Sequence, residues 1–140
     1  MVEQLSVFLE NETGGAADVV DVLARAGVDM RALALADETD FGILRLIVND
    51  PARAASALKD AGFTVRKTPV VAVEIPDRPG GLAATLNALR GTPVEYMYAF
   101  VRKSGEAAFA IFRFEDPEAA TATLRRSGAR ILDAADVQEL

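Results

Sequence analysis

The 140-residue chain contains two copies of one sequence pattern, and this internal repeat constrains its fold more than any other feature. The pair Gly14-Gly15 recurs 66 positions later as Gly80-Gly81, and Asp50-Pro51 recurs at the same offset as Asp116-Pro117. Several apolar positions recur at this offset as well, without a gap. Self-similarity at a fixed offset is typical of a duplicated structural unit, so the sequence predicts two units with the same order of elements.

Each copy begins with a segment in which apolar and polar residues alternate, at residues 4–10 and again around Val71, Val73 and Ile75. This alternation predicts a half-buried strand. The glycine pair follows, and then an apolar stripe with the spacing of a helix. The stripe residues are Ala16, Val19, Val20 and Leu23 in the first copy and Leu82, Leu86 and Leu89 in the second.

Two further strands, joined by a polar turn, come next in each copy. They are expected at residues 28–36 and 41–48, and at 94–101 and 107–114. The Asp-Pro pair then predicts a helix start, because aspartate accepts hydrogen bonds from free helix N–H groups and proline fits the first helical position. Gly62 and Gly128 predict the helix ends, and closing strands are expected at 63–68 and near 130–132.

The order β-α-β-β-α-β, read twice, predicts an α+β fold of two tandem ferredoxin-like units with antiparallel sheets and helices on one face. The expected units are residues 1–68 and residues 69–140. On each third strand, the even-numbered apolar residues are expected to face the helices. These residues are Leu44, Leu46, Val48, Ala110, Phe112 and Phe114.

The opposite side of each third strand is also largely apolar, with Ile43 and Ile47 in the first copy and Phe109 and Ile111 in the second. A sheet face open to water is expected to be more polar. Either the two units join into one larger sheet or a second chain covers this face. We therefore expect a homo-oligomer, specifically a dimer.

Composition narrows the classes of function. The chain has a net charge of −6, no histidine and no cysteine. Nucleic-acid binding depends on lysine and arginine, so we expect no nucleic-acid partner. Without histidine the commonest general base and metal ligand are missing, and we expect no enzyme activity, metal or cofactor. No apolar run approaches the roughly 18 residues of a membrane helix, and no secretion signal is recognisable, so a cytoplasmic protein is expected.

The segment from Val73 to Leu82 resembles the ACT domain family. In that family an Asp-x-Pro-Gly-x-Leu turn commonly joins the first strand to the first helix, and Asp77, Pro79, Gly80 and Leu82 stand in those places. The resemblance extends over nearly the whole chain, as two copies. It implies a protein that senses amino acids or related metabolites and signals to an enzyme or transcription factor, although the sequence does not identify that partner.

The resemblance also implies where a ligand binds, namely in the strand-to-helix turn at an interface between two ACT units. In the second copy the turn residues are Asp77, Arg78, Pro79, Gly80, Gly81 and Leu82, and in the first copy they are Asn11, Glu12, Thr13, Gly14, Gly15 and Ala16. The first turn departs from the motif because it lacks the proline and the leucine.

Helix physics supports such a site independently of the family. The start of a helix presents unpaired N–H groups and a partial positive charge, and glycines let a carboxylate approach the backbone. The side chain of Asn11 or Asp77 would accept hydrogen bonds from an ammonium group. An α-amino acid carries both groups on one carbon, which makes it the expected ligand.

Other interpretations remain open. The glycine pairs are also compatible with simple tight turns, in which Asn11 and Asp77 are turn or capping residues. The chain would then be a structural dimerisation module without a ligand, or a small enzyme on a ferredoxin-like fold, since this fold hosts many activities. The stripe of Tyr96, Tyr98 and Phe100 favours core or a subunit interface over a ligand pocket.

Overall fold

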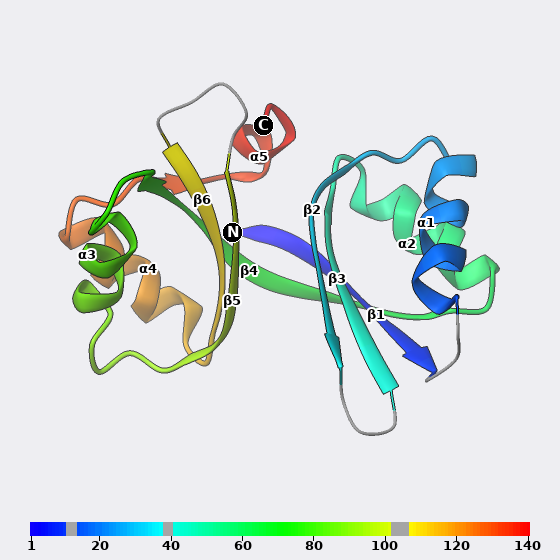
Figure 1. The fold of residues 1–140 in the computed structure, drawn as a ribbon, viewed down its shortest axis with the longest axis horizontal. Coiled ribbons are helices and arrows are strands. Elements are labelled where there is room, and N and C mark those ends of the chain that lie inside the picture. Colours follow the sequence, from blue (N-terminus) through cyan, green and yellow to red (C-terminus); the bar gives the residue numbers. More distant parts are fainter. Residues whose placement is uncertain (11–13, 38–40, 102–106) are drawn as a thin grey trace. The chain divides into compact units, whose positions relative to one another are not determined.

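A computed structural model describes residues 1–10, 14–37, 41–101 and 107–140, and it divides into two compact units (Figure 1). The N-terminal unit is Glu3–Thr68, and the C-terminal unit is Pro69–Leu140 together with Met1–Val2. The chain passes from one unit to the next within a single strand, β4 (Thr64–Pro76). The strand expected to close the first copy and the strand expected to open the second are therefore one continuous element.

The N-terminal unit contains three further strands and two helices. They are β1 (Val2–Glu10), α1 (Gly15–Arg25), β2 (Met30–Asp37), β3 (Phe41–Val48) and α2 (Pro51–Asp60). The strand order is β2-β3-β1-β4, and β3 runs antiparallel to both β1 and β2. Both helices lie on one side of this sheet (Figure 1).

The C-terminal unit repeats this arrangement. Its elements after β4 are α3 (Gly81–Ala88), β5 (Val94–Val101), β6 (Ala107–Phe114), α4 (Pro117–Arg126), β7 (Ile131–Leu132) and α5 (Ala134–Gln138). The strand order is β5-β6-β4 with β7 beside β4, and all three pairings are antiparallel. Each unit thus has the ferredoxin-like order, and the predicted fold class is confirmed. The short helix α5 was not expected from the sequence.

The third strand of each unit lies in the centre of a hydrophobic core, as predicted. Leu44 and Leu46 are at most 1 % exposed and pack with residues of β1, α1 and α2. In the C-terminal unit, the rings of Phe112 and Phe114 stack with centroids 5.3 Å apart, and both side chains are fully buried. These side chains hold the helices against the helix-facing side of each sheet.

The two Asp-Pro pairs form the helix starts predicted for them. The Asp50 carboxylate accepts a hydrogen bond from the Arg53 backbone N–H at 3.1 Å, and Asp116 does the same for Ala119 at 3.1 Å. A proline occupies the first turn of each helix. One residue beyond each C-cap, a glycine adopts the left-handed conformation, as expected for a helix end.

The predicted stripe of α3 is wrong at two of its three residues, since Leu89 is buried as expected but Leu82 and Leu86 are not. Leu82 and Leu86 are 39 % and 37 % exposed, whereas the buried residues of the helix are Gly81 and Thr85. A Cβ atom on Gly81 would lie 2.1 Å from the Pro76 carbonyl oxygen, so the helix approaches β4 at this glycine. The row that begins at Gly81 therefore faces the sheet, and the row that begins one residue later is rotated away by about 100°.

The polar side of β1 is more buried than alternation predicts. Gln4 is fully buried and Ser6 is 7 % exposed. The Gln4 side-chain amide donates to the Ser6 hydroxyl at 3.1 Å, and that hydroxyl lies 3.2 Å from the Thr68 hydroxyl on β4. These hydrogen bonds offset the cost of removing polar groups from water.

In the described parts of the chain, no helix is long and apolar enough to cross a membrane.

Candidate functional site

A cavity of about 660 Å³ lies in the C-terminal unit at the start of α3. The second half of β4, the turn into α3, the start of β6 and the segment after α4 surround it. Its lining residues are Glu74, Pro76, Arg78, Gly80, Gly81, Ala84, Thr85, Ala107, Phe109, Ser127, Gly128, Ala129 and Arg130. Its volume is in the range of cavities that hold small metabolites.

The turn into α3 is built from its glycine pair. Gly80 has a φ of 90°, in the left-handed region that favours glycine, and it is the N-cap residue of α3. The Gly81 N–H donates to the Arg78 carbonyl at 3.0 Å, and the Arg78 N–H donates to the Pro76 carbonyl at 2.9 Å. Because Gly81 has no side chain, the first turn of the helix lies directly against β4 and leaves its backbone at the wall of the cavity.

The first helix of each unit differs from the second in its capping. Asp50 and Asp116 cap α2 and α4, whereas no side chain of the described residues caps α1 or α3. The start of α3 therefore keeps N–H groups without a side-chain acceptor, together with the positive end of the helix dipole. This end of the helix can attract a carboxylate in the cavity.

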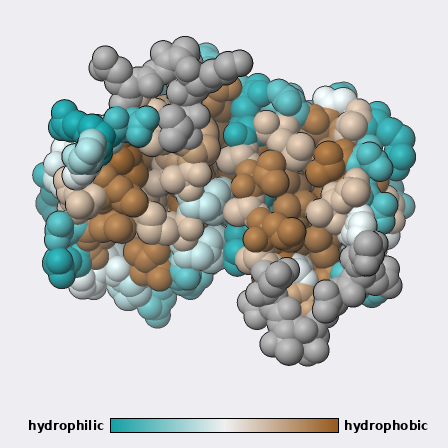
Figure 2. Space-filling model, viewed as in Figure 1, coloured by the Kyte–Doolittle hydropathy of each residue, from teal (hydrophilic) through white to brown (hydrophobic). Residues whose placement is uncertain are grey.

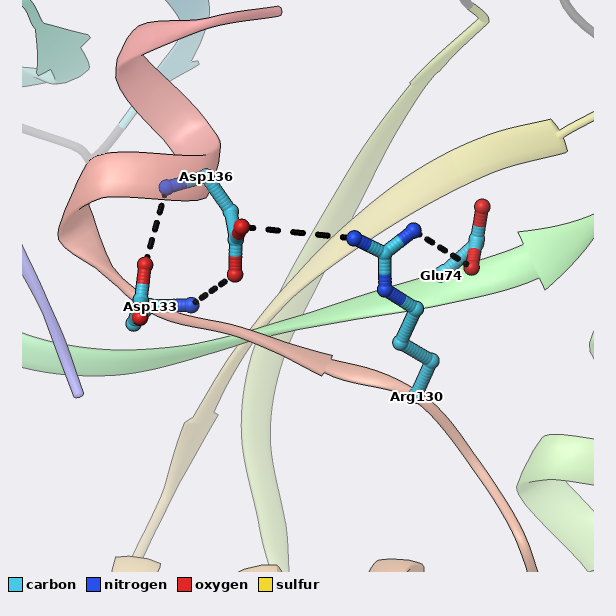
Figure 3. A network of polar contacts seen from close by, with 4 residues as sticks. All are labelled: Glu74, Arg130, Asp133 and Asp136. Atoms are coloured by element: carbon cyan, nitrogen blue, oxygen red, sulfur yellow. Dashed lines mark hydrogen bonds and ion pairs between the residues drawn. The ribbon is translucent and has the colours of Figure 1, made fainter.

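Charged side chains also line the cavity. The Glu74 carboxylate on β4 lies 3.3 Å from one terminal nitrogen of Arg130, and the other terminal nitrogen is 4.0 Å from Asp136 of α5 (Figure 3). The backbone also links the first two residues, because the Glu74 N–H donates to the Arg130 carbonyl at 2.9 Å. Arg78 adds a second guanidinium group to the lining, so the cavity offers partners for both an anion and a cation.

The segment beyond Arg130 is held by a reciprocal cap. The Asp133 carboxylate accepts from the Asp136 N–H at 2.8 Å, and the Asp136 carboxylate accepts from the Asp133 N–H at 3.0 Å (Figure 3). The hydrogen bond from the Asp136 N–H lowers the pKa of the Asp133 carboxyl below its usual value. This capping box places Asp136 at the start of α5, within reach of Arg130.

The N-terminal unit has a smaller cavity, of about 340 Å³, at the corresponding place. Its lining residues are Phe8, Leu9, Glu10, Gly15, Asp18, Phe41, Gly62, Phe63 and Thr64. At the repeat offset, Phe8 corresponds to Glu74 and Thr64 to Arg130. The ring of Phe8, which stands at the position of Glu74, lies 6.0 Å from the ring of Phe41, so this cavity has aromatic side chains in its lining.

The turn residues expected to bind a ligand divide into three groups. Arg78, Gly80 and Gly81 line the larger cavity, and Gly15 lines the smaller one. Neither lining includes Gly14, Ala16, Asp77, Pro79 or Leu82. The predicted residues Asn11, Glu12 and Thr13 lie outside the described residues.

Sequence reasoning missed Glu74, Phe109 and Arg130 as lining residues of the cavity. A departure from the repeat could have identified the charged pair, because both positions carry uncharged residues in the first copy. Within the described ranges, no three acidic side chains come together as a metal-binding group.

Comparisons with known proteins agree with the fold. The family model described as "ACT domain pair" matches residues 1–139. The chain is similar to the protein BT0572 from Bacteroides thetaiotaomicron, with 39% identity and a TM-score of 0.92 over 99% of this chain and 96% of that one. The comparison with curated proteins found no match.

Two regulatory subunits of aspartate kinase share the fold at low identity. The one from Thermus thermophilus, in its ligand-free form, is 18% identical, with a TM-score of 0.62 over 89% of this chain and 91% of that chain. The one from Thermus flavus is 19% identical, with a TM-score of 0.60 over 90% of this chain and 92% of that chain. With the family model matching almost the full length, the chain belongs to the ACT domain pair family.

Proposed function

We propose that this chain is a regulatory protein that binds an amino acid in the cavity of the C-terminal unit and catalyses no reaction. The observation that carries the proposal is the cavity itself, which opens on the uncapped start of α3. A ligand carboxylate can accept from the helix N–H groups, as anions do at helix N-termini in other proteins. The membership in the ACT domain pair family supports a regulatory role over an enzymatic one.

The side chains that line the cavity favour an α-amino acid over a simple anion as the ligand. Glu74 offers an acceptor for an ammonium group, and Arg78 strengthens the positive field near the helix start. Phe109, Ala107 and Ala84 supply apolar surface for the side chain of the ligand. A cavity with a few charged groups on a largely apolar wall is typical of small-molecule sites.

We also infer that the chain assembles as a homodimer and acts in the cytoplasm on a partner protein. An exposed edge supports the assembly. Strand β2 lies at one end of its sheet, and its side chains Leu33 and Leu35 are 54 % and 55 % exposed. Figure 2 shows apolar residues gathered on the N-terminal unit where β2 and β3 lie. An edge strand with exposed apolar side chains is a template for pairing with another chain.

A thermal-shift screen against the twenty amino acids tests ligand binding. A ligand present at 100 times its Kd adds about 2.7 kcal/mol of stability, which raises Tm by several degrees in a protein of this size. We expect a shift with one or a few amino acids. A flat screen with all twenty would overturn the proposal and favour a structural module without a ligand.

A further inference from the structure

The two cavities allow a comparison within one molecule. Each is lined by residues of the first and third strands of its unit, next to the glycine pair that starts the first helix, so the repeat supplies a similar backbone framework twice. Any difference in what the cavities bind must come from their side chains. Two of the lining positions that differ are those of Glu74 and Arg130, where the N-terminal unit has Phe8 and Thr64.

In the N-terminal unit the first of these positions, Phe8, belongs to an aromatic group. The guanidinium carbon of Arg66 lies 5.5 Å from the centroid of the Phe8 ring, and the centroid of the Phe41 ring lies 6.0 Å from it. This packing gives the cavity about half the volume of the other one. Its charged lining residues, Glu10 and Asp18, are both acidic. They would repel the carboxylate of a ligand in this cavity.

In the C-terminal unit the same positions carry opposite charges 3.3 Å apart. The Glu74 side chain is 29 % exposed and the Arg130 side chain is 62 % exposed, so solvent screens the pair. Exposed ion pairs of this kind contribute little to stability, which makes a structural role a weak explanation for their presence. Both side chains line the cavity. Each can therefore give up its ion pair with the other and bind a charged group of a ligand instead.

We infer that Glu74 and Arg130 are the ligand-recognising pair and that the C-terminal cavity is the amino-acid site, with one ligand bound per chain. This inference rests on the proposed function. Glu74 accepts hydrogen bonds from the ligand ammonium, and Arg130 donates to the ligand carboxylate beside the α3 start. The N-terminal cavity lacks both groups and does not bind the same ligand.

Isothermal titration calorimetry of the full chain tests the inference, with the amino acid that gives the largest shift in the twenty-member screen. We expect one site per chain in the wild type. Glu74→Gln and Arg130→Gln should each weaken binding tenfold or more, because a charge-assisted hydrogen bond is lost. The matched control Asp18→Asn, which removes a carboxylate from the smaller cavity, should leave the affinity unchanged.

Two ligand analogues separate recognition from a structural effect. The N-acetyl derivative of the same amino acid lacks the ammonium charge, and its carboxamide lacks the carboxylate. Wild-type protein should prefer the free amino acid to both analogues. Glu74→Gln should lose the discrimination against the N-acetyl form, and Arg130→Gln should lose the discrimination against the carboxamide, with melting temperatures close to that of the wild type.

Unchanged affinity and unchanged analogue ratios in both cavity variants would overturn the inference, and so would two sites per chain or a loss of binding in Asp18→Asn. These results are distinct from failure of the proposed function, which is absence of binding by the wild type to any of the twenty amino acids.

Discussion

Gly15 and Gly81 occupy the same position of the repeat, but the space around their Cα atoms differs. A Cβ atom on Gly81 would lie 2.1 Å from the Pro76 carbonyl oxygen, whereas on Gly15 its nearest neighbour would be the Leu9 Cβ at an ordinary 3.7 Å. Gly81 therefore stands where the fold itself allows no side chain. A loss of ligand binding in a Gly81 variant would report on folding as much as on the site.

Alanine substitutions at these two glycines should have opposite effects. Gly81→Ala should lower the free energy of unfolding by about 1–3 kcal/mol, because the backbone must move away from β4. Gly15→Ala should leave stability unchanged or raise it by about 0.4–1 kcal/mol, because alanine restricts the unfolded chain. Urea unfolding followed by circular dichroism measures both. Equal effects at the two sites would contradict the close approach at Gly81.

At the scale of elements, the first helix of each unit has no side-chain cap, whereas the second is capped by an aspartate next to a proline. Replacing Asp116 by alanine should lower the free energy of unfolding by about 1 kcal/mol, since the cap of α4 is lost. Asp116→Asn, which keeps an acceptor oxygen, should recover most of this loss. Thermal unfolding of the two variants checks the prediction, and an equal loss in both would show that the oxygen is not the cause.

Helix α5 should respond to acid through Asp133. Its carboxyl pKa is lowered below the usual value of 3.8 by the hydrogen bond from the Asp136 N–H. The stabilising contribution is therefore fully present above pH 3.8 and is lost as the pH falls through the lower pKa of the folded state. Amide resonances of α5 should shift in this acid range in a pH titration by NMR, and Asp133→Asn should abolish that step.

At the scale of the whole molecule, the exposed edge of the N-terminal unit bears on assembly. Leu33 and Leu35 lie opposite Leu46 and Leu44 in the register of β2 with β3, yet both are more than half exposed. A dimer that pairs through this edge should dissociate in the double variant Leu33→Lys, Leu35→Lys. Sedimentation velocity should then show a monomer, with Leu82→Lys on α3 as the exposed-leucine control. If wild-type protein sediments as a monomer in the same experiment, the proposed dimer is wrong.

The sequence alone determined the duplication, the β-α-β-β-α-β order within each copy, the Asp-Pro helix starts and the glycine helix ends. These features depend on hydrogen bonds and backbone angles within a few residues, so short patterns specify them. The alternation of Leu44 and Leu46 also predicted the core side of β3, because every second residue of a strand points the same way.

Tertiary structure alone decided which groups meet at the cavity and which face of α3 is buried. Glu74 and Arg130 are 56 positions apart, and they meet only because β7 lies beside β4. The burial of Gly81 and exposure of Leu82 follow from a backbone approach that hydrophobic periodicity does not contain. Local patterns specify elements, but the contacts that make a site depend on which elements the fold brings together.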